Sequence, residues 1–203
     1  MGGMKVKAKL RAKVRDLKRE LILEEAGAYF ESVGLEAAKM AEVAARCGIS
    51  VGALYKVFPS KDALFYAYIG HQIGRFLREL ETRAAAAATP EEKLRVFASL
   101  KYETFCEKAK VIKDPLSGDP LFFTKLNLSH ENPAAPVYDW LADRFSEVGF
   151  SGAEALKQAY RFSGMLLGDI EYWLVHGGTL AGEEAAAVER FLHGVTPKGK
   201  GDA

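Results

Sequence analysis

The chain has 203 residues, of which 49% are hydrophobic and 27% are charged, and its formal net charge is +1 at pH 7. This length allows one large domain or two small ones with a real core. The sequence has no run of about 18 uncharged apolar residues and no apolar segment behind its basic N-terminus, which argues against a transmembrane helix and a secretory signal. Cys47 and Cys106 form no metal-binding or disulfide pattern. We therefore expect a cytoplasmic protein without a metal, a cofactor or a membrane partner.

Positive charge is concentrated at the N-terminus. Residues 1–19 contain eight Lys or Arg residues and one acidic residue, Asp16. Such a segment suggests a polyanionic partner, although a solvated, disordered tail would have the same composition. We expect a flexible basic arm over residues 1–13.

Helical periodicity dominates the chain and strand alternation is scarce, which predicts an all-α protein of about nine helices. Gly34 is expected to end the first helix, and Ser50, Ser60, Thr89 and Ser151 are expected to cap later ones. Residues 197–203 are expected to form a frayed tail. The helices are expected at about 14–33, 39–46, 50–58, 61–88, 90–110, 121–128, 137–148, 151–176 and 183–193.

Residues 46–62, RCGISVGALYKVFPSKD, have the pattern of the turn and second helix of a helix-turn-helix. Gly48 suits a turn that needs a positive φ. Gly52 and Ala53 are small, and small residues let a helix backbone approach the major groove. The alternative is a three-helix bundle with a glycine turn and no DNA partner, which the small-residue face and the basic arm disfavour. The expected DNA-binding residues are Lys39, Ser50, Val51, Gly52, Ala53, Tyr55, Lys56 and Lys61.

These residues belong to a longer pattern that resembles the TetR family of transcriptional regulators. The resemblance covers about residues 15–66, and beyond them only the helical layout agrees. The matching residues are Arg19, Ile22, Leu23, Ala26, Phe30, Gly34, Val43, Ala44, Gly48, Ile49, Ser50, Gly52, Leu54, Tyr55, Phe58, Ser60, Lys61 and Leu64.

The resemblance implies a homodimeric regulator, most often a repressor, with two domains. Residues 14–62 would form the helix-turn-helix head, and residues 63–196 would bind a small-molecule effector and form the dimer. The effector would release the protein from a palindromic operator of double-stranded DNA, because it favours a spacing of the two heads that does not fit the site.

Two positions depart from the family pattern. The family usually has Thr at the start of the second helix, where Ala37, Ala38 and Lys39 stand in this chain. We expect the helix cap to be missing and Lys39 to supply the phosphate contact in its place. Val57 stands where the family often has His or Tyr, so one further contact with DNA is expected to be absent.

Aromatic residues are frequent in the second half, and most of them fit a hydrophobic core as well as an effector site. Asp169 lies among apolar neighbours and would be costly if buried unpaired, so it faces solvent, pairs with a base or binds a ligand. Lys101 is suited to partner an acidic group. The effector is expected to have an apolar or aromatic portion. The candidate effector residues are Phe97, Lys101, Phe105, Phe122, Phe162, Met165, Asp169 and Trp173.

Gly164 and Gly168 lie four residues apart on one expected helix. This spacing lets two helices approach closely, either across a dimer interface or within one chain.

Nothing in the sequence supports catalysis, because the four histidines are scattered and no triad, phosphate-binding loop or metal spacing is present. Two other functions stay open at this point. One is an effector-independent architectural DNA-binding protein, and the other is a small-molecule enzyme that uses Cys106 or Asp169.

Overall fold

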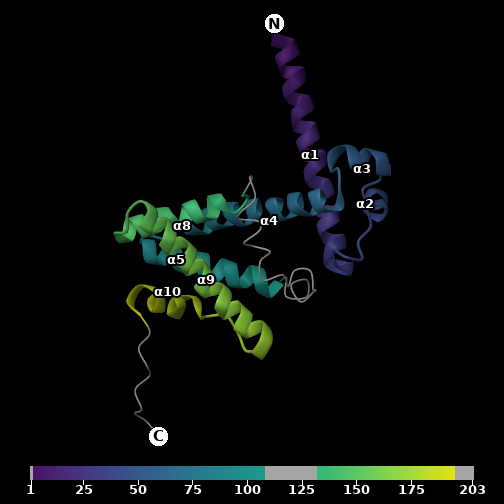
Figure 1. Ribbon diagram of the computed structural model, residues 1–203. Helices are drawn as coiled ribbons and strands as arrows, with labels where there is room; N and C mark the ends of the chain where they lie inside the picture. The colour runs from purple at the N-terminus through teal and green to yellow at the C-terminus, as the bar shows by residue number, and fades with distance from the viewer. Residues whose placement is uncertain (1, 108–131, 195–203) are drawn as a thin grey trace. The chain divides into compact units, whose positions relative to one another are not determined.

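The computed structural model describes residues 2–107 and 132–194. These ranges contain only helices, which confirms the all-α fold (Figure 1). The predicted helix at 121–128 and the tail at 197–203 lie outside the described residues. The helices are α1 (Gly2–Val33), α2 (Met40–Arg46), α3 (Val51–Val57), α4 (Lys61–Ala84), α5 (Pro90–Glu107), α8 (Ala135–Val148), α9 (Ala153–His176) and α10 (Glu184–His193).

The described residues divide into two compact units, one over residues 2–74 and the other over residues 75–107 and 132–194. Each unit has its own hydrophobic core. The boundary falls inside α4, so this helix contributes its first half to the first unit and its second half to the second. The predicted division into residues 14–62 and 63–196 concerns DNA binding and effector binding, and it stays a prediction.

The first unit is a three-helix head completed by the start of α4. Gly34 ends α1 with φ of +79°, and its N–H donates to the Phe30 carbonyl at 2.9 Å. Gly48 turns the chain between α2 and α3 with φ of +64°, a conformation that favours glycine. Both glycines act as the sequence predicts. The buried core residues of this unit are Ile22, Leu23, Ala26, Tyr29, Phe30, Ala38, Met40, Val43, Ala44, Leu54, Phe58, Leu64 and Tyr68.

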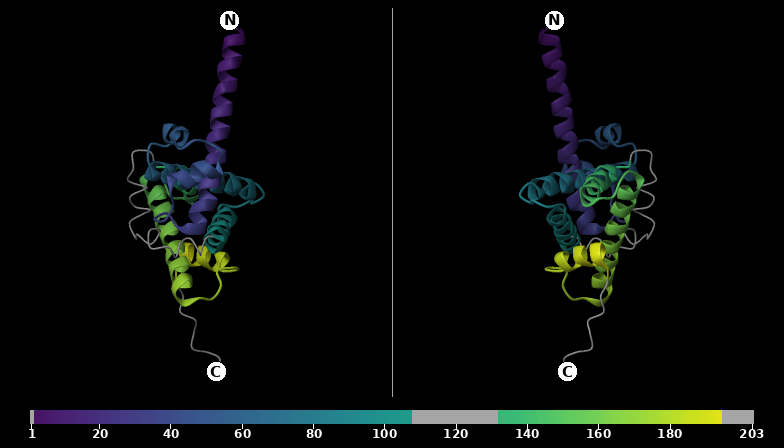
Figure 2. Two further views of the ribbon diagram at one scale, coloured as in Figure 1. Left: turned by 90° about the vertical axis from the view of Figure 1, so that its right-hand side faces the viewer. Right: turned by 90° about the vertical axis from the view of Figure 1, so that its left-hand side faces the viewer.

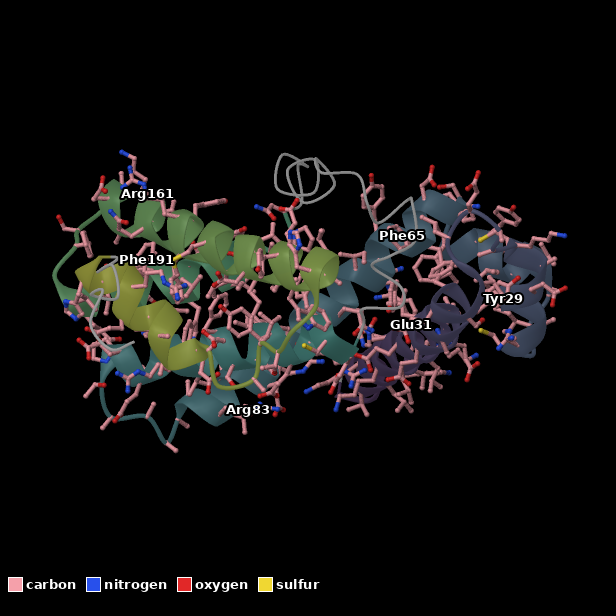
Figure 3. All side chains as sticks on the ribbon, turned by 90° about the horizontal axis from the view of Figure 1, so that it is seen from below. Tyr29, Glu31, Phe65, Arg83, Arg161 and Phe191 are labelled. Atoms are coloured by element: carbon pink, nitrogen blue, oxygen red, sulfur yellow. The ribbon has the colours of Figure 1, made fainter. Side chains whose placement is uncertain are left out.

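A notch at Gly27 lets α4 pack closely against α1. A Cβ atom at Gly27 would overlap the ring of Tyr68, which is only 5% exposed. The Tyr68 hydroxyl donates to the Glu31 carboxylate at 2.8 Å, and the Tyr68 ring meets Phe30 edge-on at 5.9 Å between centroids. Glu31 of α1 and Phe65 of α4 are labelled in Figure 3. Position 27 therefore requires a residue without a side chain.

Lys61, the first residue of α4, holds the loop that follows α1. Its ammonium donates to the carbonyls of Leu35 at 2.8 Å and Glu36 at 3.0 Å. These two residues lie in the short connection between α1 and α2, where the Leu35 carbonyl also accepts from the Ala38 N–H at 3.3 Å. Lys61 thus ties the beginning of α4 to the entrance of α2.

The predicted start of the first helix, at about Val14, is wrong, because α1 begins at Gly2. Residues 5–20 consist largely of Lys, Arg, Ala and Leu, which are strong helix formers, and no proline interrupts them. Figure 2 shows this N-terminal half of α1 as a straight helix that extends beyond the helices packed on its second half. Residues 2–13, expected to form a flexible basic arm, are therefore helical, and their flexibility stays a prediction.

The core of the second unit is built around aromatic side chains from four helices. Phe145 of α8 and Phe162 of α9 are fully buried, and their rings meet edge-on at 5.9 Å between centroids. Phe191 of α10 contacts both, at 5.5 Å from Phe145 and 5.0 Å from Phe162, and is labelled in Figure 3. Phe97 of α5 lies 6.1 Å from Phe162 and completes the group.

The helix caps agree with the sequence at three of four positions. The Thr89 hydroxyl accepts from the Glu92 N–H at 3.1 Å, and the Glu92 carboxylate accepts from the Thr89 N–H at 3.1 Å, which is a complete capping box. Ser60 accepts from the Ala63 N–H at 3.0 Å, and Ser50 caps α3. The predicted box at Ser151 is wrong. Gly152 occupies the N-cap of α9, and no side chain caps that helix.

We predict that Gly27→Ala destabilises the protein by about 1–3 kcal/mol, because the added methyl group displaces the Tyr68 ring from a packed site. Urea unfolding measures this loss. In a Tyr68→Leu background the same substitution should cost much less, since the ring is gone and Ala is the better helix former. Equal costs in both backgrounds would show that the notch does not hold Tyr68.

We predict that Lys61→Met lowers the free energy of unfolding by about 1–3 kcal/mol, because two carbonyls lose a charged donor. The exposed Lys56 on α3 provides the control, and Lys56→Met should change stability by less than about 0.5 kcal/mol. Urea unfolding of both variants tests the difference. An unchanged stability for Lys61→Met would mean that the tie to the α1–α2 loop contributes nothing.

Candidate nucleic-acid interface and effector region

The N-terminal turn of α3 presents an open surface of small residues. Ser50 starts the helix, and its hydroxyl accepts from the Ala53 N–H at 3.2 Å. Val51 is 41% exposed, and no atom of the described residues lies within 4 Å of a Cβ built on Gly52. Leu54 faces the other way and is fully buried in the head. One side of α3 therefore fixes it in the core, and the other side is free to meet another molecule closely.

The predicted phosphate-binding residues differ in how the structure places them. Tyr55 and Lys56 are exposed on α3. Lys39 is exposed at the N-cap of α2 and makes no side-chain cap, as predicted from the missing Thr. Lys61 is already bound to two carbonyls of the head, so its ammonium has one donor hydrogen left for another partner.

Two arginines that sequence reasoning did not place at this site lie over aromatic rings of the head. The Arg19 guanidinium lies 4.4 Å from the centre of the Phe58 ring, and that of Arg46 lies 4.8 Å from the centre of the Tyr29 ring. A ring face attracts a cation and limits its movement. The partners are 39 and 17 residues apart in sequence, which is why helical spacing alone does not reveal them.

This arrangement has the chemistry of a DNA-contacting surface. The Gly52 face is small enough for the helix backbone to reach base edges in a major groove. Positive groups on α1, α2 and α3 can contact phosphates, and such contacts set position without reading sequence.

The predicted effector residues are partly core and partly accessible. Phe97 and Phe162 are buried among other aromatic side chains, as the core alternative expects. Phe105, Met165 and Trp173 are only partly buried against the same core. Trp173 donates its indole N–H to the Gly178 carbonyl at 3.2 Å. Phe122 lies outside the described residues.

Lys101 is a cation held between α5 and α9. Its ammonium donates to the carbonyl and the hydroxyl of Ser163, at 2.9 and 2.8 Å, and lies 5.8 Å from the centre of the Phe97 ring. Part of the side chain is exposed, but the surroundings of the ammonium determine its titration. Burial lowers the pKa of Lys101 from 10.5 to about 7. Lys101 therefore loses much of its charge near neutral pH.

Asp169 has two partners within the described part of the chain. The Tyr102 hydroxyl of α5 donates to it at 2.7 Å, and the Arg190 guanidinium of α10 forms an ion pair with it at 3.8 Å. Burial and the nearby carboxylate raise the pKa of Tyr102. Of the three roles expected for Asp169, pairing with a base agrees with this geometry. Sequence reasoning missed Tyr102 and Arg190, because both are distant in sequence.

Gly164 and Gly168 lie on an exposed face of α9. No described atom comes within 4 Å of a Cβ built on either glycine, so they do not serve close packing within the described chain. Tyr160 and Leu167 are 42% and 37% exposed beside them. The remaining alternative, a contact with a second chain, stays a prediction.

Comparisons with known proteins assign the head. Residues 22–68 match the family described as "Bacterial regulatory proteins, tetR family". Over 77 residues the chain is 36% identical to the HTH-type transcriptional repressor KstR of Mycobacterium tuberculosis. These residues are 38% of this chain and 35% of that protein. The match thus spans about a third of this curated relative.

Solved structures show the same fold over nearly the whole chain. The fatty acid degradation regulator FadR from Bacillus halodurans has a TM-score of 0.67 at 19% identity, covering 88% of this chain and 96% of that one. FadR from Bacillus subtilis, solved in complex with stearoyl-CoA, has a TM-score of 0.67 at 16% identity, covering 86% and 98%. Residues 22–68 thus match the tetR family of bacterial regulatory proteins, and the all-helical fold of the described residues is the fold of these solved structures.

Proposed function

We propose that this protein is a ligand-responsive transcriptional repressor that binds a palindromic operator through α3. The observation that carries the proposal is the open small-residue face at Gly52, beside the exposed Val51 and Tyr55. Support comes from the tetR family match at residues 22–68 and from the repressor KstR, which resembles this chain over 77 residues. In this proposal Lys39, Lys56 and Lys61 contact phosphates, while Gly52 and its neighbours Ser50, Val51 and Ala53 meet base edges.

The repressor acts as a homodimer in this proposal, with α9 at the interface. The exposed glycines at 164 and 168 allow two copies of α9 to approach closely, and the exposed Tyr160 and Leu167 supply apolar contacts. Two α3 helices then read half-sites about 34–36 Å apart on one face of the DNA. Protection of two half-sites of one palindrome is the result expected of such a dimer.

Residues 63–196 bind the effector in this proposal, and residues 14–62 bind DNA. A molecule with an acidic group and an apolar chain suits the region, because among the described residues the Lys101 ammonium bonds to Ser163 and to no carboxylate, and it lies beside partly buried apolar side chains. Phe105, Met165 and Trp173 are the accessible members of that group. Since the structurally similar FadR of B. subtilis was solved with stearoyl-CoA, acyl-CoA thioesters are the first effectors to test.

We predict that Gly52→Ala keeps the fold and weakens operator binding, and that Gly52→Val abolishes specific binding with the fold intact. Both side chains enter open space, so only the distance between α3 and the DNA changes. Footprinting on genomic DNA fragments selected by the wild-type protein measures the protection, and circular dichroism checks the fold.

The same footprints test the effector. Protection lost on addition of stearoyl-CoA, with free coenzyme A as the control, supports a ligand-responsive repressor. Sequence-indifferent coating by wild type and Gly52→Val alike would instead identify an architectural DNA-binding protein. Protection of the palindrome by Gly52→Val at wild-type affinity would remove α3 from the groove.

We predict that stability rises with pH between about 7 and 10.5 through Lys101. In this window the unfolded chain keeps the Lys101 proton and the folded chain releases it, because the folded pKa is about 7 against 10.5. Below pH 7 both states are protonated and the penalty for a buried charge is complete. Urea unfolding at about pH 7 and about pH 9.5 should therefore show a larger rise for wild type than for Lys101→Met.

The exposed Lys157 of α9 provides the matched control. Lys157→Met should keep the wild-type rise with pH, since the ammonium of Lys157 is largely in water. If Lys101→Met and Lys157→Met change equally with pH, the ammonium of Lys101 is not buried in the folded protein.

A further inference from the structure

The N-terminal half of α1 has an apolar face that no described residue covers. Five aliphatic side chains recur at three- or four-residue spacing along it. They are Val6, Leu10, Val14, Leu17 and Leu21, which are 68%, 62%, 45%, 56% and 54% exposed. We call this set the aliphatic stripe. Single exposed leucines are ordinary, but five on one side of a helix are not.

The aliphatic stripe is separate from the face that packs in the head. At about 100° of rotation per residue, its five members fall within an arc of roughly 80°. The buried residues Ile22, Ala26 and Phe30 of the same helix point roughly the opposite way on this count. The next residue on the same side of the helix is Glu24, which is charged, so the stripe ends before it. Burial in the head therefore does not explain it.

Basic side chains surround the aliphatic stripe. Counted at about 100° per residue, Lys13 lies on one side of the stripe and Lys7 and Lys18 lie on the other. All three are exposed. Further positive side chains lie on the remaining surface of the segment, whose one acidic residue is Asp16. The complete set is Lys5, Lys7, Lys9, Arg11, Lys13, Arg15, Lys18 and Arg19.

We propose that this segment binds the surface of an anionic lipid bilayer. The helix lies in the plane of the surface, with the aliphatic stripe at the boundary of the acyl chains and the flanking lysines at the lipid phosphates. Among the described residues no helix has the length and apolar content needed to cross a bilayer. The proposed contact is therefore peripheral, and it differs from the sequence expectation of no membrane partner.

Two other occupants fit the segment less well. DNA matches the lysines, but its phosphates offer no apolar surface to the aliphatic stripe. A second copy of α1 matches the stripe, but Lys7 and Lys13 would then lie at the flanks of a helix pair, where opposite charges normally meet. Only a surface that is both anionic and apolar matches the two features together.

The test uses the full chain and lipid vesicles. Vesicles of phosphatidylglycerol and phosphatidylcholine in equal parts should bind the protein at least about tenfold more tightly than vesicles of phosphatidylcholine alone, and added salt should reduce the difference. Co-sedimentation measures the binding. Equal binding to both vesicles, or binding to neither, would overturn the proposal.

Matched variants separate the aliphatic stripe from the charges. Leu10→Gln with Leu17→Gln keeps a good helix former and the full charge, and it should weaken binding to the anionic vesicles at least about tenfold. Lys7→Gln with Lys18→Gln should also weaken it. Ala8→Gln, on the other side of the helix, should leave it unchanged.

Measurements of DNA affinity and oligomeric state distinguish a lipid bilayer from DNA and from a second copy of α1 as the partner of the aliphatic stripe. The leucine variant should keep its affinity for DNA within about threefold and its wild-type oligomeric state, with unchanged helicity by circular dichroism. Wild-type vesicle binding by this variant would overturn the proposal. A parallel loss of DNA affinity would assign the aliphatic stripe to the DNA complex, and a smaller oligomer would assign it to a second copy.

Discussion

The contact between Tyr68 and the Gly27 notch is the constraint on which the head depends. It sets how closely α4 can lie against α1, and α1 is the helix on which α2 and α3 pack. The Tyr68 hydroxyl also donates to the carboxylate of Glu31 on α1, so both the ring and the hydroxyl of Tyr68 contact α1. Lys61 adds a tether at the other end of the same segment. The first half of α4 is thus part of the head.

The positive residues of the head therefore have different roles. Lys61 maintains the fold, whereas Lys39 and Lys56 are exposed and available to an anion. Arg19 and Arg46 are intermediate, because each lies over an aromatic ring yet keeps its charge at the surface. A substitution that removes Lys61 therefore acts first on stability, so its effect on the proposed DNA contact has to be measured separately from its effect on unfolding.

Local patterns predicted much of this molecule. Helical periodicity, the turn glycine at 48 and the box at Thr89 depend on neighbours in sequence, and the structure confirms them. The start of α1 was missed because charge density suggested an arm, although Lys, Arg, Ala and Leu are good helix formers. The pairing of Asp169 with Tyr102 and Arg190 was beyond the sequence, since it depends on how α5, α9 and α10 meet. For the same reason, periodicity identified Phe97 and Phe162 but did not distinguish core from binding site.

The openness of α3 at Gly52 has a consequence for how such proteins diversify. Leu54 fixes the helix in the core, while the opposite side makes no contact within the described chain at position 52. Replacements there change what the helix meets without disturbing what it packs on. In the proposed function, sequence preference can therefore drift through substitutions at exposed neighbours such as Val51, while position 52 stays small and the scaffold is inherited unchanged.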